Sequence, residues 1–173
     1  MTESNRMESD AEHGAMKNDR TRITAGPGGR EIVIVQTFDA PREKVFKVFA
    51  DPRQLPEWWG PKNLKTKVEK MQVKPGGSWR VIQTDPSGNK YGFHGVYHDV
   101  VPQERVVRTS EFEGMPGHVS LETAVFQERE GRTVVTTTVV FQSVEDRDGM
   151  MGSGMEKGVV ESGERFAELL ERM

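Results

Sequence analysis

The chain has 173 residues, with 24 lysines and arginines against 27 aspartates and glutamates, so its net charge is −3. This balance provides no basic field for a nucleic acid, and no run approaches the roughly 18 apolar residues that cross a bilayer. The absence of cysteine excludes disulfides, thiolate nucleophiles and cysteine-ligated zinc. The N-terminus lacks the apolar core of a signal peptide, so we expect a cytoplasmic protein without nucleic-acid or membrane-spanning contacts.

The N-terminal segment differs in composition from the rest of the chain. Residues 1–21 have few apolar side chains and mixed charges, which predicts a disordered extension. His13 lies in it and is not expected to be a ligand. Residues 22–173 carry regular apolar patterns and are long enough for a single folded domain. We expect Arg22 to Thr24, at the start of this domain, to pair at a sheet edge.

The first regular elements are one strand and two short helices. Residues 30–38 are rich in β-branched side chains, which predicts a strand. The Asp-Ala-Pro sequence that follows breaks this strand, and the apolar spacing over residues 41–50 predicts a short helix. A second short helix is expected to end at Trp58, because Gly60 and Pro61 terminate it.

Six further strands are predicted in the middle of the chain. Their apolar residues alternate, and turn-forming residues such as Gly, Pro and Asn separate them. Strands of similar length at regular spacing favour an antiparallel meander over parallel βαβ units. The six predicted strands are 64–73, 78–84, 91–101, 104–113, 119–128 and 133–143.

The last segment, residues 150–173, predicts one long amphipathic helix. Apolar residues recur on one helical face from Met151 to Met173, and such a face needs a surface that covers it. The predicted fold is therefore α+β: an antiparallel sheet of about seven strands curls round the C-terminal helix and leaves a cavity between them. Glycines at 152, 154, 158 and 163 require either close helix–sheet approach or an irregular start before Met155.

Several ordered motifs are shared with a known superfamily. They are F-D-A-P-R-E-K-V-F (38–46), D-P-R-Q-L-P-E-W-W-G-P (51–61), P-G-G-S-W-R (75–80), G-V-Y-H-D-V-V-P-Q-E-R-V-V (95–107) and G-M-E-K-G (154–158). With them, residues 22–173 resemble the SRPBCC, or START/Bet v-like, superfamily. Within it the chain resembles bacterial homologues of the C-terminal domain of the heat-shock-protein-ninety ATPase activator. The resemblance implies the helix-grip fold and a link to the stress response.

The resemblance also contains one departure. Members of the family often place a tryptophan after the glycine of the final helix, whereas here Val159 follows Gly158. The smaller side chain either enlarges the cavity or leaves space that a neighbouring side chain fills.

The candidate ligand-binding residues are mainly the aromatic and apolar side chains that this fold brings toward a cavity. Trp58 and Trp59 either form an aromatic wall or plug the open end of the sheet, and strand parity leaves open which strand residues face inward. His94 is the candidate polar group. The full set is Trp58, Trp59, Trp79, Phe93, His94, Tyr97, Phe112, Phe126, Phe141, Met151, Met155 and Val159.

Other polar residues offer no strong pattern for catalysis or metal binding. On a strand, His94 and His98 lie roughly 13 Å apart at about 3.3 Å per residue, too far to share an ion. No P-loop or G-x-S-x-G motif is present, so we expect no metal, cofactor or catalytic residue. We interpret Glu111 and Glu113 as solvated. Five residues are either cavity contacts or part of a solvated face: Arg80, Gln83, Thr123, Thr137 and Gln142.

The leading functional hypothesis is non-enzymatic binding of a small hydrophobic ligand, namely an apolar or aromatic molecule or a lipid. The alternative, implied by the resemblance, is a module that binds a chaperone through an exposed surface. A second alternative is a cyclase- or hydrolase-like enzyme, which needs two convergent titratable groups in the cavity. A monomer and a homodimer are both compatible with the sequence.

Overall fold

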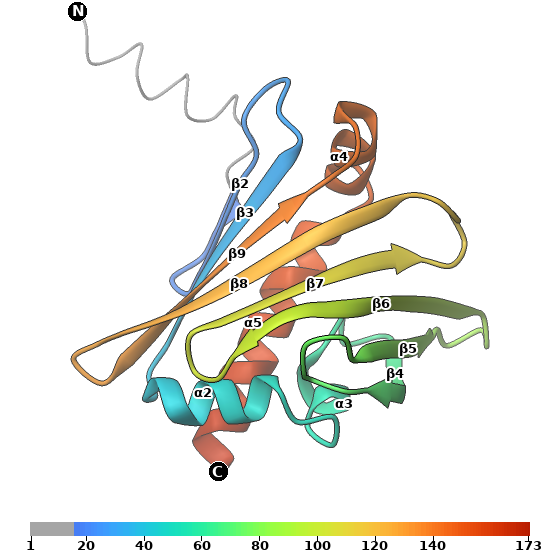
Figure 1. Ribbon diagram of the computed structural model, residues 1–173. Helices are drawn as coiled ribbons and strands as arrows, with labels where there is room; N and C mark the ends of the chain where they lie inside the picture. Colours follow the sequence, from blue (N-terminus) through green and yellow to red (C-terminus); the bar gives the residue numbers. More distant parts are fainter. Residues whose placement is uncertain (1–15) are drawn as a thin grey trace, which may run out of the picture.

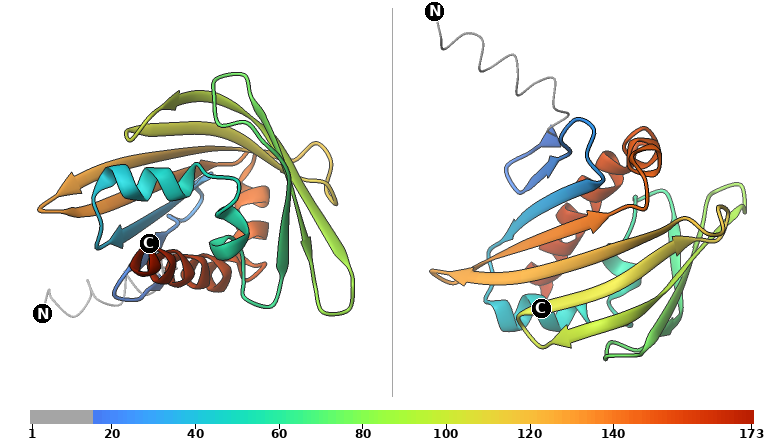
Figure 2. Two further views of the ribbon diagram at one scale, coloured as in Figure 1. Left: turned by 90° about the horizontal axis from the view of Figure 1, so that it is seen from below. Right: turned by 45° about the horizontal axis from the view of Figure 1, so that its top comes forward.

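The computed structural model describes residues 16–173. In this part of the chain, nine strands form one antiparallel sheet in the order β1-β2-β3-β9-β8-β7-β6-β5-β4, and two short helices follow β3 (Figure 1). Helix α5 (Met155–Arg172) crosses the concave side of the sheet, and α2 (Arg42–Phe49) lies on the same side (Figure 2). The predicted α+β helix-grip arrangement is confirmed.

The seven predicted strands correspond to β3 through β9, and two more lie at the edge beside β3. Strand β2 pairs with β3 and contains the predicted edge segment, while β1 extends the sheet into the segment predicted as an extension. Residues 1–15, including His13, lie outside the described residues. The strands are β1 (Met16–Lys17), β2 (Thr21–Thr24), β3 (Glu31–Phe38), β4 (Lys65–Met71), β5 (Ser78–Thr84), β6 (Lys90–Val101), β7 (Arg105–Phe112), β8 (Val119–Arg129) and β9 (Arg132–Val140).

The prediction of one helix over residues 150–173 was wrong at its beginning. Helix α4 (Val144–Met151) starts at Ser143, whose side chain accepts a hydrogen bond from the Asp146 backbone N–H at 3.0 Å. The helix then stops, and Gly154 adopts a φ of 81° immediately before α5. Glycine tolerates this left-handed conformation, so the chain can turn sharply between the two helices. The other short helix, α3, is Leu55–Trp58.

Gly163 shows why α5 contains a glycine in its interior. A Cβ atom at this position would lie 2.6 Å from Gln36 Nε2 and 3.0 Å from Thr21 Oγ1, on β3 and β2. The same Gln36 Nε2 donates to the Val159 carbonyl at 3.4 Å. Of the two reasons expected for these glycines, close helix–sheet approach therefore applies at Gly163, and an irregular helix start applies at Gly154.

Two apolar clusters lie under α5, and they differ in how completely they are covered. Cluster 1 surrounds the C-terminal half of the helix, where Phe166 packs 4.8 Å from Phe38 and 4.9 Å from Trp58 between ring centroids. Cluster 2, near β3 and the end of β9, is contacted by the half-buried Met155 and Val159. Among the described residues, no helix combines the length and apolarity needed to span a bilayer.

Candidate functional site

Strand pairing places one row of side chains across the inner face of the sheet, toward α5. In this row Tyr97 of β6 pairs with Arg108 of β7, Arg108 with Glu122 of β8, and Glu122 with Val139 of β9. Tyr97 and Val139 are buried core residues, so their partners in the row share the inner face. An oppositely charged pair therefore lies between two apolar clusters.

A second cross-strand pair lies beside the first on the same face. Ser110 pairs with Ser120, and the Ser120 hydroxyl donates to the Ser110 carbonyl at 3.4 Å. We call the four residues Arg108, Ser110, Ser120 and Glu122 the polar square. The Nε of Arg108 donates to Glu122 Oε2 at 3.0 Å, and their side chains keep 16% and 23% of their accessible surface. This ion pair is shielded but still reachable from solvent.

The guanidinium of Arg108 packs against the indole ring of Trp79. The Arg108 Cζ lies 4.0 Å from the centroid of the Trp79 ring, a cation–π contact. Trp79 Nε1 donates to the Thr109 carbonyl at 3.0 Å, across the position of Gly95. A Cβ on Gly95 would overlap that carbonyl and approach the indole nitrogen to 2.7 Å, so glycine is needed for the indole to reach β7.

The positive charge of Arg108 is stable near neutral pH. Burial disfavours the charged form of Arg108, but the nearby groups of Glu122 and Tyr97 outweigh it and raise the pKa of Arg108 above its ordinary value. Burial also raises the pKa of the Tyr97 phenol, against the opposing charge of Arg108. Arg108 is therefore a permanent cation beside a neutral phenol.

Half-buried aromatic side chains lie on the same face, next to the polar square. The ring centroids of Trp59 and Phe93 are 5.6 Å apart, and those of Phe93 and Phe112 are 5.2 Å apart. Tyr91 lies 6.4 Å from Phe112. We call Trp59, Tyr91, Phe93 and Phe112 the aromatic ladder. It offers flat apolar surface beside the ion pair.

The candidate residues predicted from the sequence are distributed over four places. Trp58, Trp79, Tyr97 and Phe126 are buried in cluster 1 and form the floor of the inner face. Trp59, Phe93 and Phe112 belong to the aromatic ladder. Phe141 is buried in cluster 2, where it lies near the half-buried Met151, Met155 and Val159. His94 is separate from these groups.

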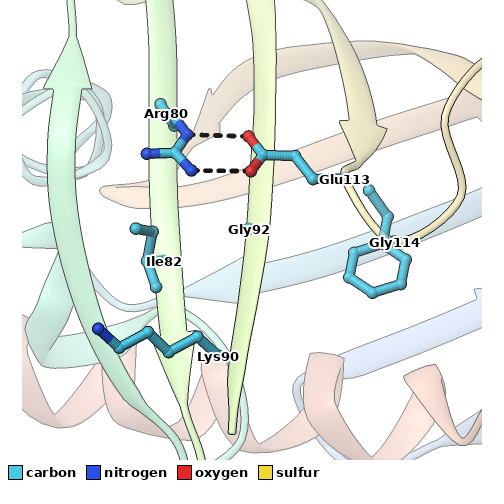
Figure 3. Close-up of a pocket in the computed structure, with 7 residues that line it drawn as sticks. Arg80, Ile82, Lys90, Gly92, Glu113 and Gly114 are labelled. Carbon is cyan, nitrogen blue, oxygen red and sulfur yellow. Dashed lines mark hydrogen bonds and ion pairs between the residues drawn. The ribbon is translucent and has the colours of Figure 1, made fainter.

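His94 lies on the outer face of β6, opposite to Phe93 and Tyr97. Its Nδ1 is 2.9 Å from Glu113 Oε2 and its Nε2 is 3.6 Å from Glu111 Oε1. Glu113 also crosses over Gly92 to form a two-fold hydrogen-bonded pair with Arg80 (Figure 3). These bonds from Arg80 and His94 lower the pKa of Glu113 to about 2. Glu111 and Glu113 were interpreted as solvated, but their side chains are mostly shielded: Glu113 forms an ion pair with Arg80, and Glu111 accepts a hydrogen bond from the Gly117 N–H.

Two hollows on the described part of the chain lie away from the interface between α5 and the sheet. One, of about 330 Å³, is beside the Arg80–Glu113 pair and is also lined by Ile82, Lys90, Gly92, Gly114 and Phe112 of the aromatic ladder (Figure 3). The other, of about 430 Å³, lies between the β2–β3 turn and Arg147 of α4. On the inner face, the candidate side chains Phe93, Met155 and Val159 are half-buried and therefore partly accessible.

Sequence reasoning placed none of the four members of the polar square, Arg108, Ser110, Ser120 and Glu122, among the candidate ligand-binding residues. A signal was present: if Val106 and Phe112 face inward, alternation along β7 puts Arg108 and Ser110 on the same side. Of the other polar candidates, Gln83 is buried at the inner face, Thr137 pairs with the inner residue Ala124, and Gln142 accepts from the Val119 N–H. Arg80 and Thr123 alternate to the outer face.

Comparison with known proteins agrees with the helix-grip fold. The model of the family described as Activator of Hsp90 ATPase homolog 1-like protein matches residues 39–171. No curated protein matches the chain.

Solved structures of bacterial proteins share the fold over most of their length. A protein from Arthrobacter aurescens is 27% identical, with 87% of this chain and 91% of that chain covered and a TM-score of 0.80. A protein from Rhodobacter sphaeroides is 23% identical, with 90% and 100% covered and a TM-score of 0.81. Protein Ms6760 from Mycobacterium smegmatis is 23% identical, with 90% and 96% covered and a TM-score of 0.78.

Proposed function

We propose that this chain, which belongs to the family of Activator of Hsp90 ATPase homolog 1-like proteins, binds a small hydrophobic ligand without transforming it. The ligand is an apolar or aromatic molecule or a lipid. It lies between the inner face of the sheet and the first turns of α5, against the aromatic ladder and the half-buried Met155 and Val159.

The observation that carries this proposal is the incomplete burial of apolar side chains on an inner face. Phe93, Met155 and Val159 face the helix–sheet interface and yet are only half-buried. Covering such surface with a ligand is favourable by about 25 cal/mol per Å² of apolar area removed from water. The interface has the chemistry of a small-molecule site: apolar walls with a few polar groups.

The chain connection at the start of α5 supports an adaptable site. Met151 and Met155 flank the glycines at 152 and 154, and the positive φ of Gly154 marks a sharp turn between α4 and α5. Methionine side chains repack around ligands of different shape because they are unbranched and flexible. We infer that the first turns of α5 shift to admit the ligand, because the methionines and the glycine turn at their start allow this movement.

Displacement of a fluorescent hydrophobic dye tests the proposal. Wild-type protein should bind the dye and release it to competing apolar compounds. Val159→Trp should fill the space beside Met155 and weaken dye binding by about tenfold or more. The matched control is Val96→Trp, the same substitution at a 40% exposed position on the outer face of β6. Equal dye binding by both variants and the wild type would contradict the proposal.

A chaperone-binding module is the second candidate, and membership of a family named after an activator of the Hsp90 ATPase favours it. Such a module would use an exposed surface rather than the helix–sheet interface. Chaperone capture by purified protein, unchanged in Val159→Trp, would support this candidate. Absence of chaperone capture together with dye binding that Val159→Trp abolishes would favour the ligand-binding function.

A further inference from the structure

The chemistry of the polar square defines what kind of polar group a ligand carries. Resting on the proposed function, we infer that the ligand has an uncharged head able to donate and accept hydrogen bonds, such as a carboxamide, and that this head binds Arg108 and Glu122. A carboxylate or an ammonium on the same apolar tail binds more weakly.

The ion pair supplies both kinds of hydrogen-bonding partner at one place. Arg108 donates through Nε to Glu122, and its guanidinium carries several further N–H donors. A carboxylate such as Glu122 accepts more than the single bond from Arg108. A carboxamide matches this arrangement, because its carbonyl accepts from the guanidinium and its NH₂ donates to the carboxylate.

Ser110 and Ser120 extend the same preference along the strands. They form the adjoining cross-strand pair, and each is half-buried on the inner face. A hydroxyl both donates and accepts, so it serves an uncharged head without adding a net charge. All four residues of the polar square together are therefore polar but electrically balanced.

Balanced charge is what excludes acids and amines. A carboxylate at the polar square would compete with Glu122 for Arg108 and leave two negative groups around one cation. An ammonium would compete with Arg108 for Glu122 in the same way. The side chains keep only 16% and 23% exposure, so solvent compensates such an excess charge poorly. An uncharged head leaves the existing pair intact.

Trp79 restricts the orientation of the Arg108–Glu122 ion pair. The guanidinium is held between the indole face, 4.0 Å away, and the Glu122 carboxylate, while Trp79 itself is fixed by its bond to Thr109. A head group therefore meets donors and acceptors that are already oriented, and few side-chain rotamers have to be ordered on binding.

Three probes with the same eight-carbon chain test the inference: octanamide, octanoate and octylamine, each competing with the hydrophobic dye near pH 7. Wild-type protein should prefer octanamide over either charged probe by about tenfold. Glu122→Gln should reverse the order toward octanoate, because Arg108 becomes an uncompensated cation. Arg108→Gln should favour octylamine. Arg105→Gln, an exposed position on the same strand, should keep the wild-type order.

The outcomes separate this inference from the proposed function. If none of the probes displaces the dye and Val159→Trp leaves dye binding unchanged, the proposed function itself fails. If the probes bind but wild-type protein prefers octanoate, or Glu122→Gln keeps the wild-type order, the inference fails and the ligand-binding function stands. Glu122→Gln preserves the shape of the side chain, so it decides the matter alone if circular dichroism shows Arg108→Gln to be unfolded.

Discussion

The two halves of α5 face the same sheet but are covered to different extents. In the C-terminal half, Phe166, Ala167, Leu169 and Leu170 are all buried. In the N-terminal half, Met155 and Val159 remain half-buried against cluster 2. The C-terminal half thus provides most of the helix's contribution to stability, and the N-terminal half retains apolar surface that a ligand can cover.

The polar contacts of α5 also differ between its N-terminal and C-terminal halves. From the middle of the helix onward, two side chains bind the backbone of Gly60. The Gly60 N–H donates to Ser162 Oγ at 2.9 Å, and Arg165 donates to the Gly60 carbonyl. At the C-terminus, Lys44 Nζ donates to the Leu170 carbonyl at 2.8 Å, where a cation satisfies the free carbonyls and the helix dipole. These contacts leave the first turns as the part of α5 with the fewest constraints from α2 and α3.

The largest effect expected from this comparison is on stability. Phe166→Ala should lower the free energy of unfolding by about 3–5 kcal/mol, because it leaves a cavity among Phe38 and Trp58. Val159→Ala, in the open half, should cost only about 1 kcal/mol, since its side chain is half-buried. Urea unfolding monitored by circular dichroism measures both. Equal losses would mean that the two halves are covered alike.

Substitution of two glycines of α5 by alanine should change the stability of the protein in opposite directions. Gly163→Ala should destabilise the protein by about 1–3 kcal/mol, because the new methyl would press on Gln36 and Thr21. At Gly158 a Cβ would meet Pro61 Cδ at an ordinary 3.6 Å, so Gly158→Ala should stabilise by about 0.5–1 kcal/mol through helix propensity. Thermal or urea midpoints distinguish the two, and a stabilising Gly163→Ala would contradict the close approach.

The smallest effect concerns pH and the outer face. The pKa of Glu113 is lowered from 4.5 to about 2 by Arg80 and His94, so its pairing stabilises the folded state above pH 4.5. As the pH falls from 4.5 toward 2, the unfolded chain takes up the proton first and this stability is lost. Glu113→Gln should therefore reduce the loss of stability between pH 5 and pH 3, measured by urea midpoints.

A control on the other side of the molecule completes this prediction. Glu168→Gln changes an exposed carboxylate of α5 and should leave the acid-induced loss as it is in the wild type. Because Glu113 lies on the outer face, Glu113→Gln should also leave dye binding near pH 7 unchanged. A strong loss of dye binding in this variant would place the ligand at the outer hollow instead of beside α5.

The elements were predictable from local pattern, whereas the site depended on contacts between distant residues. Alternation along β5 gave the strand its correct bounds, since Trp79 and Val81 are apolar at every second position. The start of α5 was misplaced because the apolar stripe continues through Met151, although Gly154 interrupts the helix. Glycine at 152 and 154 was the signal for that break.

The polar square shows what local pattern could not supply. Arg108 and Glu122 look like solvated residues in their own strands, and only the register of β7 against β8 makes them a pair. The same register puts Tyr97 and Val139 at either end of the row, which identifies the face as the inner one. His94 shows the opposite error: it was predicted to bind the ligand, but it follows Phe93 on β6 and its side chain therefore lies on the outer face.

The most direct test is an NMR titration in which octanamide is added to protein whose methionine methyl groups are isotopically labelled. We predict that the signals of Met151 and Met155 shift with increasing ligand while those of the exposed Met115 and Met173 stay in place. Shifts confined to Met115 or Met173, or no shift at ligand concentrations that displace the dye, would contradict binding beside the first turns of α5.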